Sequence, residues 1–160
     1  MKKFILLYWT TTALFFAIFY WDISPISNII NSMQTDFTTL LTSLTLEDGM
    51  IDGYSILISQ HYHLIIEKAC NGLIPYLFFI ASIIAFPSTI IHKIIWAVIG
   101  YVVLIVVNVF RIWMITQLVL DEVGNFSLAH DVIGNALLIF TSLLLFILFV
   151  KSRARYNTKK

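Results

Sequence analysis

The sequence has little charge, a single cysteine and no internal repeat. Charged residues make up 12% of the 160 residues, and hydrophobic residues make up 59%. A soluble domain usually has about a quarter of its residues charged, so this composition excludes a sizeable soluble domain. The lone cysteine, Cys70, excludes a disulfide within the chain. We expect membrane lipids as partners and no nucleic acid.

Long hydrophobic runs are abundant instead. A membrane-spanning helix needs roughly 20 mainly apolar residues, and four stretches approach that length: about 4–21, 70–86, 94–110 and 132–150. The second reaches it only if the cysteine loop at its start is included. The sequence therefore predicts an all-α integral membrane protein, with about four transmembrane helices in one membrane domain over 1–160.

The first span has two interpretations. Met-Lys-Lys followed by an apolar run resembles a secretory signal peptide, which ends in a small-residue cleavage site. Here the run continues into bulky Phe19, Tyr20 and Trp21, an aromatic cluster typical of the membrane interface. We therefore expect an uncleaved anchor.

The distribution of lysine and arginine predicts the orientation. Basic residues concentrate in cytoplasmic loops, and placing both termini inside brings most of them to that side, including those of a basic tail over 151–160. We expect a multi-pass protein of the cell membrane, with outer loops over 22–69 and 111–131. The inner basic residues would be Lys2, Lys3, Lys93, Lys151, Arg153, Arg155, Lys159 and Lys160.

The first outer loop has structure of its own. Residues 26–44 can form an amphipathic helix, and Asp48-Gly49 and Asp52-Gly53 are turn pairs. Apolar residues then alternate on both sides of Gln60-His61, which predicts a small β-hairpin that delivers the cysteine loop to the membrane surface. In the second outer loop, the first half of 111–131 either continues the third helix or lies along the interface.

This topology brings three residues used in thiol chemistry to the outer ends of spans. A thiol attacks as the thiolate, which a helix N-terminus or a nearby cation stabilises. Cys70 precedes a predicted helix, and Arg111 and His130 are the candidate cations. His130 is also the natural acid or base near neutral pH. We predict that these three residues meet at the extracytoplasmic face.

Neighbouring residues can support this group. Asn71-Gly72 forms a flexible turn whose backbone N–H groups can face a developing oxyanion. Asn108 precedes Arg111 by three residues, so both share one helix face, and Asn108 can orient Arg111 or a substrate.

Plainer interpretations compete with catalysis. A lone cysteine in an apolar protein is usually a small buried hydrophobe, and His130 can be an interfacial histidine. Lys68 beside the cysteine either snorkels to the headgroups or has a functional role. His61 and His63 would lie on one side of a strand and could contribute two metal ligands, but nothing accompanies them. We predict no metal and no cofactor.

Three short blocks, "EKACNGL", "NVFRI" and "HDVIG", resemble the signature of the exosortase/archaeosortase family. That signature has a Glu-x-x-Cys-x-Gly block, an Asn-x-x-Arg block and a later His or Arg followed by Gly. Each block alone is a weak signal, but here they occur in order at successive outer span ends. The chain departs from the family at Asn71, where Ser is frequent, at Ile74, where Arg is frequent, and in its small number of spans. The matching residues are Glu67, Cys70, Gly72, Asn108, Arg111, His130 and Gly134.

The resemblance implies an exosortase-like cysteine transpeptidase of the membrane. Such enzymes process exported proteins that end in a short motif, a membrane helix and a basic tail, and join the new carboxyl end to a lipid or glycan acceptor. Cys70 would be the nucleophile, Arg111 the oxyanion or thiolate stabiliser, and His130 the proton-transfer residue. The alternatives are a membrane cysteine protease without transfer and a non-catalytic assembly or scaffold subunit.

Overall fold

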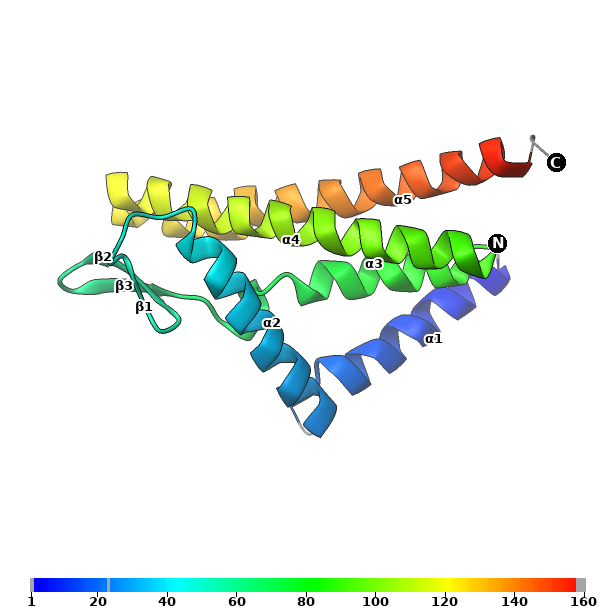
Figure 1. Ribbon diagram of the computed structural model, residues 1–160, viewed down its shortest axis with the longest axis horizontal. Coiled ribbons are helices and arrows are strands. Elements are labelled where there is room, and N and C mark those ends of the chain that lie inside the picture. Colours follow the sequence, from blue (N-terminus) through cyan, green and yellow to red (C-terminus); the bar gives the residue numbers. More distant parts are fainter. Residues whose placement is uncertain (1, 23, 158–160) are drawn as a thin grey trace.

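The computed structural model describes residues 2–22 and 24–157 as a helical protein with one small antiparallel sheet (Figure 1). The helices are α1 (Lys2–Phe19), α2 (Pro25–Ser43), α3 (Leu73–Ala85), α4 (Ile90–Asp121) and α5 (Asn135–Asn157). The strands are β1 (Ile51–Asp52), β2 (Ser55–Ser59) and β3 (Tyr62–Ile65). Three short helical segments complete the chain: η1 (Lys68–Cys70), η2 (Val123–Asn125) and the π-helical η3 (Leu128–Gly134).

The helices fit the predicted all-α membrane protein. By length and apolar composition, α1, α4 and the helical run Val123–Arg153 can each cross a membrane. The fourth predicted span, α3, is apolar but has only 13 residues, about 20 Å at 1.5 Å per residue. That is less than the roughly 30 Å of a hydrocarbon core. Within its described residues, the chain thus has three full-length candidate spans and one short apolar helix.

The short helix α3 lies at the centre of the bundle and packs against α1, α4 and α5. Phe79 and Ile83 of α3 are buried with Leu104 of α4 and Phe149 of α5. Gly100 of α4 permits this packing, because a Cβ there would lie 2.1 Å from the ring of Phe79. Protein surrounds α3 on several sides, so it contacts little of its environment directly.

Helix α4 is longer than its predicted span and continues past Arg111 to Asp121. This is the first of the two alternatives for the start of the second outer loop. The extension stays helical because the sheet covers its apolar side: Ile56 and Leu64 form one buried cluster with Ile112 and Ile115. The prediction ended the span early because a charged residue interrupts the hydrophobic run there.

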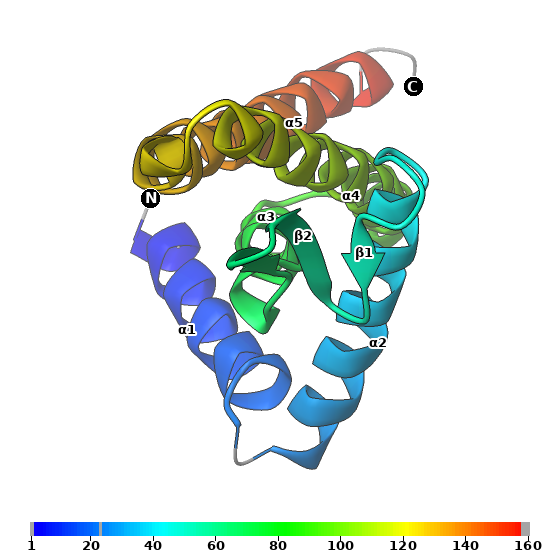
Figure 2. The same ribbon diagram turned by 90° about the vertical axis from the view of Figure 1, so that its left-hand side faces the viewer.

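The sheet contains the predicted hairpin, with β2 and β3 antiparallel and the turn at Gln60-His61. The short strand β1 adds to it, giving the order β1-β2-β3. Both predicted turn pairs have their glycine in the left-handed region, with φ +84° at Gly49 and +60° at Gly53. The strand β1 lies on the side of α2 (Figure 2), where the Tyr54 hydroxyl donates to Asp36 at 2.5 Å.

Helix α2 confirms the predicted amphipathic helix, but its polar face is buried and its apolar face is exposed, the reverse of a helix in a soluble protein. Its buried face is entirely polar, whereas an apolar stripe on another side is exposed. An apolar outer face is what a helix in contact with lipid presents. The buried residues are Ser27, Asn31, Gln34, Thr35, Thr38, Thr39 and Thr42, and the exposed apolar residues are Ile26, Ile29, Met33, Phe37, Leu40 and Leu44.

The polar face of α2 holds Asn71, which is fully buried. The Asn71 amide nitrogen donates to Asn31 Oδ1 at 3.2 Å and Thr35 Oγ1 at 3.3 Å. The Asn71 carbonyl accepts from Gln34 at 3.0 Å and Thr38 at 3.2 Å. We call Asn71 and these four residues the polar anchor. The turn that we expected to be flexible is instead tied to α2, because amides buried in an apolar surrounding require partners.

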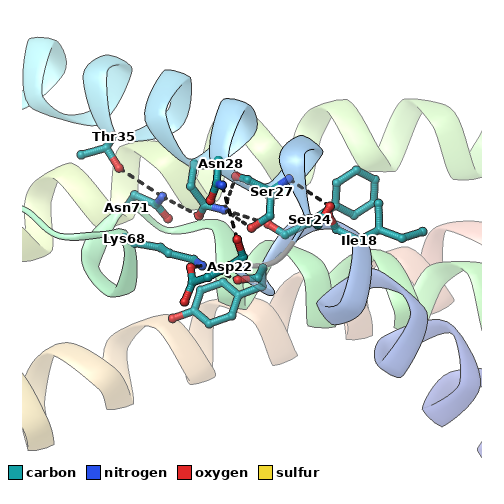
Figure 3. Close-up of polar contacts among 11 residues, drawn as sticks. Ile18, Asp22, Ser24, Ser27, Asn28, Thr35, Lys68 and Asn71 are labelled. Carbon is teal, nitrogen blue, oxygen red and sulfur yellow. Dashed lines mark hydrogen bonds and ion pairs between the residues drawn. The ribbon is translucent and has the colours of Figure 1, made fainter.

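A second contact ties the same loop to the turn between α1 and α2 (Figure 3). Lys68 Nζ lies 2.5 Å from Asp22 Oδ1, also bonds the carbonyl of Tyr20 and sits over the Tyr20 ring. These contacts decide neither of the two interpretations of Lys68, snorkelling or a functional role; they show that its charge has a protein partner. The loop is therefore fixed from two sides.

Removing the centre of the polar anchor should destabilise the protein. Asn71→Ala leaves the buried acceptors of Asn31 and Thr35 without their donor, and each unsatisfied buried group costs about 1–3 kcal/mol. We expect the thermal midpoint in detergent to fall by several degrees.

Asn28→Ala is the matched control for this change, because it removes the same side chain from an exposed position on α2. Among the described residues, the Asn28 amide donates one long bond, to the exposed Asp22 carbonyl at 3.3 Å. Water can replace that bond, so the midpoint should change little. Equal midpoints for the Asn71 and Asn28 variants would contradict a stabilising role of the anchor.

Candidate active site

The predicted nucleophile, Cys70, ends the short helix η1, and Gly72 follows it with φ +80°. The Cys70 amide donates to the Glu67 carbonyl at 2.8 Å, and the Cys70 carbonyl accepts from Asn108 Nδ2 at 2.8 Å. A Cβ at position 72 would lie 3.2 Å from the Asn108 side chain. Glycine is thus needed at position 72 both for its backbone conformation and for the close approach of α4.

His130 faces the thiol from the π-helical segment η3. Its Nε2 lies 3.4 Å from Cys70 Sγ, and its Nδ1 lies 2.8 Å from Asp131 Oδ1. Asp131 in turn accepts from the Ser127 hydroxyl at 2.9 Å, and the imidazole stacks on Phe126 with a centroid distance of 5.2 Å. The ring therefore has a carboxylate on one nitrogen and a thiol at the other.

Arg111 approaches the same thiol from α4 and is only 2% exposed. Its side chain lines the same cavity as Cys70, and its Nη2 donates to Asn135 Oδ1 at 3.2 Å. The Arg111 Nε is buried, with no hydrogen-bond partner among the described residues. Gly134 makes room for this side chain, because a Cβ there would lie 2.6 Å from Nε.

These side chains line one cavity of about 390 Å³, within the size range of ligand sites. Cys70, Arg111 and His130 form its polar part, and Glu67 is exposed at its edge. The remaining lining is largely apolar and comes from α4, η2–η3 and the sheet: Ile56, Tyr62, His63, Leu64, Ile65, Ile66, Ala69, Ile112, Ile115 and Phe126. Residues far apart in the sequence thus meet in one hollow.

The supporting residues act differently from expectation in two cases. Asn108 bonds the Cys70 carbonyl and so positions the cysteine loop, not Arg111. Asn71 belongs to the polar anchor. Gly134 and Gly72 provide the space that the Arg111 and Asn108 side chains occupy.

Two residues at the site were missed by the sequence reasoning, Asp131 and Asn135. Consecutive residues of an α-helix do not face each other, so the acid next to His130 attracted no attention. In the π-helical segment the two side chains do meet. Asn135 joins them, because its amide donates to the Asp131 carbonyl at 3.1 Å while its oxygen accepts from Arg111. The available signal was the polar spacing in "HDVIGN".

His61 and His63 do not lie on one side of a strand, as a pair of metal ligands there would. His61 lies in the turn of the hairpin, whereas His63 lies on β3. The described residues contain no group of three or more His, Cys, Asp or Glu side chains that could hold a metal ion.

The arrangement predicts that His130 and Asp131 together raise the reactivity of the thiol. An imidazolium stabilises the thiolate, and the Asp131 carboxylate stabilises the imidazolium. Because Cys70 is the only cysteine, its alkylation rate by iodoacetamide can be measured in the whole protein. We expect the rate at neutral pH to fall about tenfold or more in His130→Gln, and about two- to fivefold in Asp131→Asn, whose partner is part-exposed.

Asp121→Asn is the matched control for the second change, because Asp121 is exposed at the end of α4. Its alkylation rate should equal that of the unaltered protein. A His130→Gln protein that reacts at the unaltered rate would show that the contact between imidazole and thiol has no effect on the thiolate.

Comparison with known families gives a match over most of the chain. The profile of the transmembrane exosortase family matches residues 2–147 of the 160-residue chain. The matched region contains every residue that lines the cavity. Neither the comparison with curated proteins nor the comparison with solved structures finds a match.

Proposed function

Because this chain belongs to the transmembrane exosortase family, we propose that it is a membrane cysteine transpeptidase. It cleaves the C-terminal sorting signals of exported proteins and transfers the new carboxyl end to a lipid or glycan acceptor. The observation that carries the proposal is the placement of the Cys70 thiol 3.4 Å from the His130 imidazole. The Arg111 guanidinium shares their cavity.

In the first half of the reaction, His130 takes the thiol proton and the Cys70 thiolate attacks the scissile carbonyl. The carbonyl oxygen gains negative charge, and N–H donors of Arg111 stabilise it. The Arg111 Nε, which has no partner among the described residues, supports this role, since it is a donor already desolvated and fixed. His130 then gives its proton to the leaving amine, and a thioester on Cys70 remains.

In the second half, a nucleophile of the acceptor attacks the thioester. His130 takes the proton of that nucleophile, Cys70 leaves as the thiolate, and the thiolate then takes this proton from His130, so the starting thiol and neutral imidazole are restored. Asp131 keeps the imidazole in one orientation through both halves, because it accepts from Nδ1 and leaves Nε2 toward the sulfur. Transfer to an acceptor is distinguished from transfer to water by the mass of the product's carboxyl end.

Substitutions of Cys70, Arg111 and His130 should each impair processing, for different chemical reasons. Cys70→Ser should abolish processing, because a hydroxyl is not ionised as a thiol is. Arg111→Lys should fail severely, since one ammonium cannot reproduce the planar fork of donors. His130→Ala should lower turnover about 100-fold or more. The measurement is conversion, in membranes, of a tagged exported protein that ends in a motif, a membrane helix and a basic tail.

Arg153→Lys is the control for the arginine change, because Arg153 packs on Phe86, which ends α3 at the opposite end from Gly72 and the cysteine loop. It should process normally when enzyme abundance is equalised between samples. Near-normal turnover in Cys70→Ser would end the transpeptidase proposal and favour a scaffold subunit.

We also propose that both termini are cytoplasmic and that the cavity opens on the extracytoplasmic side. Both chain ends lie at one end of the bundle, and the sheet lies at the other (Figure 1). From Lys93 to Arg111, α4 rises about 27 Å at 1.5 Å per residue, close to one hydrocarbon thickness. The basic residues at the ends of the chain support a cytoplasmic assignment.

Labelling tests this orientation. In a Cys70→Ala background, His61→Cys at the exposed hairpin turn and Lys151→Cys at the exposed end of α5 each provide one thiol. A membrane-impermeant maleimide should label only His61→Cys in intact cells, after any outer membrane is made permeable. Labelling of Lys151→Cys alone would show the opposite orientation.

A further inference from the structure

The cavity follows one strand along its whole length. An unbroken run of residues, Tyr62–Glu67, lines it together with Cys70. This run contains all of β3 and the residues that lead from β3 to the cysteine loop. Among the described strands, no other contributes a continuous stretch, since only Ile56 of β2 reaches the cavity. The backbone of β3 is therefore part of the cavity wall.

The register of the sheet shows which backbone groups of β3 are engaged. Ile66 donates to the Tyr54 carbonyl at 2.8 Å, and Ile56 is paired with Leu64. In an antiparallel pair, the residues that exchange bonds alternate with residues that do not. Leu64 and Ile66 thus direct their N–H and C=O groups toward β2. His63 and Ile65 direct theirs away from it.

No described strand pairs with that outward side. The sheet order β1-β2-β3 makes β3 an edge strand. The other edge, β1, lies on the side of α2, where Tyr54 bonds Asp36 (Figure 2). The β3 edge lies on the opposite side of the sheet, and both His63 and Ile65 are exposed. An open edge of this kind is a template for another strand.

We propose that the free edge of β3 binds the substrate as an added strand. An extended segment next to the scissile bond would pair its main chain with His63 and Ile65, and so carry the scissile carbonyl to Cys70. This inference rests on the proposed function and adds how the peptide is held. The partner is an extended peptide, because the edge offers alternating donors and acceptors at the spacing that a peptide main chain matches.

The lining of the cavity gives the same segment its side-chain contacts. Alternate side chains of an added strand point to one face, and the face toward α4 is closed by Ile112, Ile115 and Phe126. Those positions favour apolar side chains at every second substrate residue. Main-chain pairing supplies binding that does not depend on sequence, and the apolar wall supplies selectivity.

Proline substitution tests the pairing directly. Ile65→Pro removes an outward N–H while leaving the β2 bonds of Leu64 and Ile66 in place, and proline is tolerated at strand edges. We expect kcat/KM for the tagged exported substrate to fall about tenfold or more, mainly through KM. Ile65→Ala removes the side chain but keeps the N–H, and should lower kcat/KM much less than Ile65→Pro does.

Ile51→Pro is the matched control at the other edge. Leu57 donates to the Met50 carbonyl at 2.7 Å, and Ile51 is paired with Ile56, so Ile51 directs its backbone away from β2 as Ile65 does. This variant should process normally at equal abundance. Equal kcat/KM for Ile65→Pro and Ile65→Ala would overturn the proposal.

Cross-linking gives an answer even if Ile65→Pro does not accumulate. In Cys70→Ala enzyme, p-benzoylphenylalanine is placed at Ile65, or at Tyr54 on the opposite side; both positions are exposed, at 57% and 46%. Light should join the substrate to the enzyme from position 65 only. Cross-links from both positions, or from neither, would overturn the proposal. The proposed function fails separately, by normal processing in Cys70→Ser.

Discussion

The site depends on the hydrogen bonds between the buried Asn71 and helix α2. A polar group without a partner costs several kcal/mol in a lipid surrounding, so the amide and carbonyl of Asn71 hold the polar face of α2 against the loop. The thiol of Cys70 is one residue away. The position of the cysteine is therefore set by α2, a helix none of whose described side chains lines the cavity.

Helix α4 supplies the second constraint. Asn108 bonds the Cys70 carbonyl, and one turn later Arg111 lines the same cavity as the thiol, so a single helix positions both the cysteine backbone and the guanidinium. The guanidinium is buried, and such a charge is tolerated when it is held by dipoles and counter-charges. Gly72 and Gly134 are the residues that let α4 and the Arg111 side chain approach.

The sequence was sufficient for features that leave a periodic or positional trace. The alternation of apolar residues predicted the hairpin, and the apolar runs predicted the membrane helices. The positions of Cys70, Arg111 and His130 at the ends of the predicted spans indicated that they meet, and they line one cavity. The sequence was insufficient where contacts between distant residues decide which side chains are buried and which way they point. The buried polar stripe of α2 reads as a water-facing surface, because nothing local shows that Asn71 lies against it. The orientation of Asp131 depends on a π-helical turn, which has no simple sequence signal.

The same geometry explains why a small sheet accompanies a membrane bundle. The extension of α4 beyond Arg111 would expose Ile112 and Ile115, and the hairpin covers them with Ile56 and Leu64. Covering that face with a sheet, in place of another helix, leaves one strand edge without a partner in the described chain. Because the edge strand leads into the cysteine loop, its residues line the same cavity as the thiol. The β2–β3 hairpin thus both packs against α4 and lines the cavity that contains Cys70.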